Sequence, residues 1–75
     1  MIEQAVEYAG AKERLIRLRE VRARVGLGAS TVYRYLAEGK FPRPVELGGG
    51  RVAWLESEVD AWIASRAEAA RLGRE

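Results

Sequence analysis

The side chains with the clearest chemical signature in this sequence are its arginines, which gather in the middle of the chain. Residues 14 to 51 hold nine positive side chains against three acidic ones, a net charge of +6. Residues 1 to 13 and residues 52 to 75 each carry a net charge of −2, so the whole chain has a formal charge of only +2. A basic centre between acidic ends predicts a polyanionic partner for the centre. The alternative is an ordinary arginine-rich surface.

Catalytic chemistry is not supported by the residue types present. The 75 residues include no cysteine and no histidine, so the sequence offers no thiolate or imidazole for catalysis or for a structural zinc site. Glu56, Glu58 and Asp60 could suggest a metal site, but the positive end of a helix dipole explains these carboxylates without one. We therefore expect no enzyme activity, no cofactor, no bound metal and no small-molecule substrate.

The length and hydropathy of the chain restrict its class further. Seventy-five residues form one domain at most. No apolar run approaches the roughly 20 residues needed to cross a bilayer. The first residues carry glutamates where a secretory signal would carry lysines. We expect a cytoplasmic protein without a membrane partner.

The elements that must position the arginines begin near residue 15. Residues 15–17 have β character, and apolar residues then recur at Leu18, Val21 and Val25, which predicts a short amphipathic helix. The helix is expected to stop at residues 26–28, Gly-Leu-Gly, where the first glycine suits a left-handed cap.

A second helix is expected to begin at Gly28 or Ala29 and to end at Gly39. Its apolar stripe consists of Val32, Tyr35 and Leu36. At 100° per residue, the opposite face and its shoulders are polar and basic. They hold Ser30, Thr31, Tyr33, Arg34 and Glu38.

The polar face of this second helix carries the candidate DNA-reading residues, since two helices joined by a glycine turn can present the second one to the major groove. Arg34 can donate two hydrogen bonds to a guanine, and Ser30 and Thr31 can reach base edges or phosphates. Tyr33 stays open between a hydroxyl contact to phosphate and a half-buried position on the helix shoulder. The alternative for the whole face is a solvated surface of a purely structural bundle.

A β-hairpin is expected after the second helix. Residues 41–47 contain two prolines two positions apart, which predicts an extended edge strand. Residues 48–50 are three glycines and are interpreted as a tight turn. A phosphate-binding loop is disfavoured, because no Gly-Lys-Ser/Thr follows the glycines. Residues 51–54 alternate as a returning strand would. Lys40, Arg43 and Arg51 are the candidate phosphate contacts here, with a solvated hairpin as the alternative.

A last helix is expected to start near Glu56 or Ser57, where Ser57 and Asp60 resemble a capping box. Its core face should consist of Leu55, Val59, Trp62 and Ile63. Trp54 and Trp62 are interpreted as core residues and not as platforms for stacking bases.

Residues 14 to 66 together resemble the AlpA family of prophage-associated regulators. The motifs that carry the resemblance are Leu18-Arg19-Glu20-Val21, Gly26-Leu27, Ser30-Thr31-Val32-Tyr33-Arg34, Phe41-Pro42-Arg43-Pro44-Val45 and Glu58-Val59-Asp60-Ala61-Trp62-Ile63. The resemblance implies a winged-helix fold related to the MerR and excisionase DNA-binding domains, with the second helix in the major groove and the hairpin wing on the phosphate backbone. Two positions depart from the family pattern. Gly28 stands where the family often has a serine cap, and Arg22 stands where an apolar residue is common.

We therefore expect a mainly helical α+β fold, a winged helix-turn-helix with three core helices and a short β-hairpin wing. Residues 1–13 are expected to form a weakly ordered arm, residues 14–66 the DNA-binding domain, and residues 67–75 a fraying tail. The expected function is sequence-specific binding of double-stranded DNA by a transcriptional regulator. Side-by-side copies or a homo-oligomer would help specificity, because one module of this size buries only about 600–1,000 Å² on DNA. An excisionase-like DNA-bending factor and a protein-interaction adaptor remain as alternatives.

Overall fold

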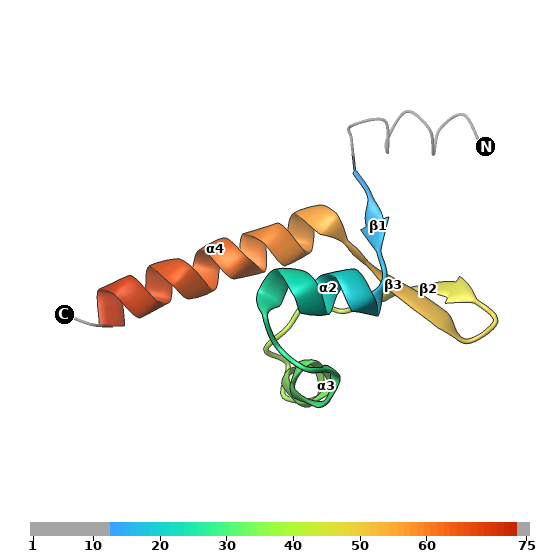
Figure 1. The fold of residues 1–75 in the computed structure, drawn as a ribbon, viewed down its shortest axis with the longest axis horizontal. Coiled ribbons are helices and arrows are strands. Elements are labelled where there is room, and N and C mark those ends of the chain that lie inside the picture. The colour runs from blue at the N-terminus through green and yellow to red at the C-terminus, as the bar shows by residue number, and fades with distance from the viewer. Residues whose placement is uncertain (1–12, 74–75) are drawn as a thin grey trace.

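The computed structural model describes residues 13–73 (Figure 1), so almost all of the predicted N-terminal arm lies outside the described residues. The described part contains three helices and a three-stranded antiparallel sheet. In chain order the elements are β1 (Leu15–Ile16), α2 (Leu18–Val25), α3 (Ala29–Ala37), β2 (Val45–Gly48), β3 (Arg51–Leu55) and α4 (Glu56–Gly73). The predicted fold class, a mainly helical α+β fold of winged helix-turn-helix type, is confirmed.

The turn between α2 and α3 forms as the glycines predict. Gly26 adopts the left-handed conformation with φ +73°, and its N–H donates to the carbonyl of Arg22 over 2.8 Å, which ends α2. Gly28 has extended backbone and serves as the N-cap residue of α3. In Figure 1 α3 is seen almost end-on while α2 lies across the view, so the two helices cross steeply.

The sheet is larger than the hairpin that the sequence predicted. β3 is its central strand, because β1 pairs with β3 on one side and β2 pairs with it on the other. Ile16 lies opposite Trp54, and a bulge between Glu46 and Gly48 interrupts the pairing of the hairpin. The predicted edge strand over residues 41–47 is too long, since residues 41–44 lie outside β2.

The shortened strand has a structural reason, which is that Phe41 turns into the core. Phe41 is buried and packs edge-to-face against Trp62, with ring centres 4.8 Å apart. Trp54 is completely buried, whereas Trp62 is half-buried and packs against the core from its edge. The core cluster consists of Ile16, Val21, Val32, Phe41, Trp54 and Val59.

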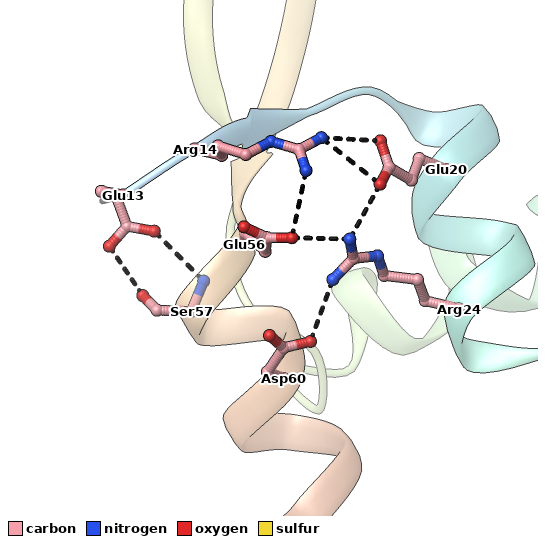
Figure 2. Close-up of polar contacts among 7 residues, drawn as sticks. All are labelled: Glu13, Arg14, Glu20, Arg24, Glu56, Ser57 and Asp60. Carbon is pink, nitrogen blue, oxygen red and sulfur yellow. Dashed lines mark hydrogen bonds and ion pairs between the residues drawn. The ribbon is translucent and has the colours of Figure 1, made fainter.

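The start of α4 differs from the predicted capping box. Ser57 lies inside the first turn of the helix, and its partner is Glu13, not Asp60 (Figure 2). The Ser57 backbone N–H donates to Glu13 Oε2 over 3.1 Å, and its hydroxyl donates to Glu13 Oε1 over 2.8 Å. A carboxylate from outside the helix therefore satisfies the first turn.

The C-terminal half of α4 extends away from the rest of the fold (Figure 1). The helix continues through residues 67–73, and every side chain in that stretch is exposed. Fraying of this tail remains a prediction. The helices of the described residues are all too short or too polar to span a membrane.

Candidate nucleic-acid interface

The second helix of the described residues, α3, is anchored on one face and open on the other. Val32 is completely buried, and Tyr35 and Leu36 pack against the core as predicted. Ser30, Tyr33 and Arg34 are exposed, and Thr31 is half-buried. With 48% of its surface exposed, Tyr33 is the most open aromatic side chain of the helix.

The N-terminus of α3 is favourable for an anion. Gly28 has no side chain to cap it, and the first turn of α3 includes no acidic residue. The positive end of the helix dipole is therefore not offset by a carboxylate of the helix itself. Ser30 and Thr31 lie in this turn, beside the unpaired backbone N–H groups that a helix start presents.

The exposed Arg34 side chain contacts the ring of its neighbour Tyr35. Its guanidinium carbon is 5.6 Å from the centre of the Tyr35 ring, which is a cation–π contact. Such a contact contributes about 0.5–1 kcal/mol at an exposed site. A bidentate hydrogen bond to a base is stronger than this, so the contact orients Arg34 without locking it.

Arg51 is the first residue of β3, directly after the glycine turn, so it lies on a strand arm of the hairpin as predicted. Gly48, Gly49 and Gly50 all have positive φ, so the turn uses backbone conformations that other residues rarely adopt. The Arg51 guanidinium folds back over this turn and lies within 3.4 Å of the position that a Cβ at Gly49 would occupy. Arg43 is exposed but precedes β2, so its predicted position on a strand arm is wrong.

The segment between α3 and β2 is held by two indole groups. The Trp62 N–H donates to the carbonyl of Lys40 over 2.8 Å, and the Trp54 N–H donates to the carbonyl of Pro42 over 2.9 Å. These bonds fix α3 relative to the hairpin, so the two parts of the candidate interface have a defined spacing. The Lys40 ammonium is exposed and lies 3.4 Å from Glu38, a surface pair that contributes little to stability.

A cluster of ion pairs joins α2 to α4, and Figure 2 shows its five members. We call it the α2–α4 cluster, and it consists of Arg14, Glu20, Arg24, Glu56 and Asp60. Arg24 is its centre: its Nη2 lies 2.6 Å from Glu56 and 2.9 Å from Glu20, and its Nη1 lies 3.2 Å from Asp60. Hydrogen bonds to Glu56 and then to Glu20 raise the pKa of Arg24 above its usual value.

The α2–α4 cluster changes the interpretation of the basic centre. Arg14 and Arg24 were counted among its nine cations, but carboxylates of the same chain neutralise them. Six arginines of the basic centre, residues 14–51, form no ion pair with another residue of the described stretch 13–73. These are Arg17, Arg19, Arg22, Arg34, Arg43 and Arg51, all of them exposed.

The comparison with known families concerns the same stretch of chain. A family model described as "Prophage CP4-57 regulatory protein (AlpA)" matches residues 14–67. The chain belongs to the AlpA family. The match begins at the first residue of the α2–α4 cluster and ends where α4 leaves the core, so it spans every element of the candidate interface.

Two relatives of the AlpA-family chain are informative. An uncharacterized protein of Enterobacteria phage P4, ORF88, is 51% identical over 55 residues, which cover 73% of this chain and 62% of the phage protein. The Escherichia coli K12 protein named DNA-binding transcriptional activator AlpA is 32% identical over 59 residues, which cover 71% of this chain and 84% of that protein. The chain thus spans less than two thirds of the phage P4 relative. Both the family and the second relative are described as regulators, in line with the expectation that the chain is not an enzyme.

Proposed function

We propose that this AlpA-family protein binds double-stranded DNA and regulates transcription, with α3 in the major groove and the β2–β3 hairpin on the phosphate backbone. The main observation behind this proposal is that α3 is amphipathic. It buries Val32 on one face and leaves Ser30, Tyr33 and Arg34 exposed on the other. The E. coli relative's description as a DNA-binding transcriptional activator supports the same function for this chain.

In this proposal the exposed side chains divide into base contacts and backbone contacts. Arg34 reads a guanine through its O6 and N7 atoms, and Ser30 and Thr31 contact base edges or phosphates near the start of α3. The exposure of Tyr33 favours a hydroxyl contact to phosphate over a half-buried structural position. Lys40, Arg43 and Arg51 contact phosphates and so orient the helix without reading sequence.

The size of the molecule implies more than one copy on each DNA site. One module of this kind buries about 600–1,000 Å² on DNA, whereas specific interfaces usually bury more. We infer that two or more copies bind side by side, and that the fixed spacing of α3 and the hairpin sets the register of each copy on the duplex.

The test begins with a site selected from random duplexes, followed by affinity measurements on that site and on an unrelated duplex. Replacing Arg34 by alanine should cost about 1–3 kcal/mol on the selected site and less on the unrelated one. Replacing Arg51 by alanine should weaken both duplexes nearly equally. Arg71, exposed near the far end of α4, provides a matched control whose replacement should change neither affinity.

Two outcomes would count against the proposal. A folded wild-type protein that binds no duplex even at low salt would contradict DNA binding and favour a protein-interaction adaptor. If Arg51→Ala altered the preferred sequence while Arg34→Ala weakened all duplexes alike, the hairpin would be the reading element and the docking proposed for α3 would be wrong.

A further inference from the structure

The two sides of α2 have different surroundings. Glu20 and Arg24 belong to the α2–α4 cluster and lie on the side of the helix that faces α4. The midpoint between Arg19 and Arg22 lies about 150° around the helix axis from the midpoint between Glu20 and Arg24, as the helical repeat requires. Both are exposed and have no acidic partner within residues 13–73.

The unpaired side of α2 adjoins α3. Arg19 and Arg22 line an open hollow together with Ala23 and Leu27. Leu27 is in the turn that precedes α3, so the hollow lies beside the N-terminus of that helix. This is the end of α3 that carries the positive dipole and no acidic residue in its first turn.

The helix itself does not account for this pair of arginines. Arg19 is the second residue of α2, where the positive end of the dipole disfavours a cation. Arg22 lies three residues further on, and like charges at that spacing on a helix repel. The helix dipole favours Arg22, which lies in the last turn of α2. It does not favour Arg19, nor does it favour placing the two arginines side by side.

We propose that Arg19 and Arg22 form a second anion site, which binds the phosphodiester backbone of the DNA strand beside the groove that α3 enters. This inference rests on the proposed function, because the ligand is part of the same duplex. Guanidinium groups donate paired hydrogen bonds to phosphate oxygens, and a bound phosphate relieves the repulsion between the two arginines. The contact is to the backbone alone, so it strengthens binding to every duplex sequence.

The experiment measures affinity for a random-sequence duplex between 50 and 200 mM salt. The proteins are the wild type, Arg19→Ala, Arg22→Ala, the double variant and the control Arg71→Ala. Each lost phosphate contact should make the slope of log affinity on log salt shallower by about 0.9. The ratio of wild-type to single-variant affinity should therefore fall about 3.5-fold across this salt range. The control should follow the wild type.

Thermal unfolding of the same proteins separates a binding role from a structural one. Because Arg19 is unfavourable in its helix, Arg19→Ala should melt at the wild-type temperature or above it while binding DNA more weakly. A double variant with the wild-type slope and affinity would overturn the inference and leave the proposed function standing, as expected if the pair faced an acidic protein surface. A wild-type protein that binds no duplex would overturn both.

Discussion

Two tryptophan side chains, Trp54 and Trp62, each donate one hydrogen bond to the segment between α3 and β2. The two rings differ in how deeply they are buried. The Trp54 N–H bonds the Pro42 carbonyl from a completely buried ring, whereas the Trp62 N–H bonds the Lys40 carbonyl at the surface. Water can replace a lost donor at Lys40 more readily than at Pro42. The two tryptophans therefore contribute unequally to stability.

Replacing each tryptophan by phenylalanine tests this difference. Trp54→Phe should lower the free energy of unfolding by about 2–3 kcal/mol, because a partly buried carbonyl loses its partner and a cavity remains beside the buried ring. Trp62→Phe should cost about 0.5–1.5 kcal/mol, since the ring contact with Phe41 persists. Urea unfolding of the two variants measures both values. A larger loss for Trp62→Phe would contradict the assignment of Trp54 as the central aromatic residue.

For single residues, the sequence predicted which side chains of the helices are buried better than it predicted which residues they contact. The burial of Val32 and Val59 follows from helical periodicity, and both are completely buried. Phe41 had no such signal, because it stands alone between a lysine and a proline in a segment without periodicity. The ion pairs that join Arg14 and Arg24 to Glu56 were equally invisible, since Glu56 lies 42 and 32 positions away from them.

Between elements, Arg24 connects α2 to α4. Its side chain is 27% exposed, and that of its nearest partner, Glu56, is 21% exposed, so solvent screens the pairs only in part. Without Arg24, Asp60 would lose its ion-pair partner, and Arg14 alone would remain beside Glu20 and Glu56. Arg24 is therefore the cation that joins the carboxylates of α2 and α4 most directly.

Arg24→Met should lower the free energy of unfolding, because it removes three ion pairs that each contribute modestly. The loss should diminish in high salt, which weakens the cluster in the wild type. Arg22→Met, on the same helix but outside the cluster, is the matched control and should leave stability nearly unchanged. Equal losses for the two variants would argue against a specific role of the cluster.

The contact between Glu13 and the first turn of α4 predicts a pH dependence. Hydrogen bonds from the Ser57 hydroxyl and then from its backbone N–H lower the pKa of Glu13 below its ordinary value of 4.5. A carboxyl group with a lowered pKa in the folded state stabilises the protein above its unfolded pKa, and this contribution is lost as the pH falls through the folded pKa.

Glu13→Gln should therefore be less stable than the wild type at neutral pH, and the difference should shrink as the pH falls below about 4.5. Thermal unfolding of the two proteins from pH 7 to pH 3 checks this. If the stability difference between the two proteins stayed constant over that range, the charge of Glu13 would not be its source.

The elements themselves were largely predictable, and their long-range pairing was not. The predicted cap at Gly26 and the predicted starts of α3 and α4 match the structure because local rules decide them. The pairing of β1 with β3 brings Ile16 opposite Trp54, and no local pattern specifies a partner so far along the chain. The capping box at Ser57 failed for the same reason, since Glu13 is distant in sequence.

In the molecule as a whole, paired charges are concentrated in the α2–α4 cluster, and arginines unpaired within residues 13–73 lie elsewhere on the surface. The acidic groups Glu56 and Asp60 face Arg14 or Arg24 in the α2–α4 cluster, while six arginines of the basic centre, residues 14–51, have no acidic partner within residues 13–73. A formal charge of +2 therefore understates the cationic surface available to a polyanion.

The salt dependence of DNA binding should reflect this available surface. If roughly four to six phosphates are neutralised, log affinity should fall with log salt with a slope of about −3.6 to −5.4. Titrations of the wild-type protein at several salt concentrations give the slope directly. A slope near that of a single contact, about −0.9, would mean that most of the unpaired arginines lie outside the interface.

The positions of Trp54 and Trp62 have one more consequence, which is optical. Both indoles are natural fluorophores, and both are bonded to the segment that joins α3 to the hairpin. The completely buried Trp54 should be shielded from iodide, whereas Trp62, half-buried and with the Arg66 guanidinium carbon 5.5 Å from its ring centre, should be quenched by that anion. If α3 and the hairpin stay in register when DNA is added, the shielded part of the emission should not change. Unlabelled protein thus carries its own reporter of the spacing between the two.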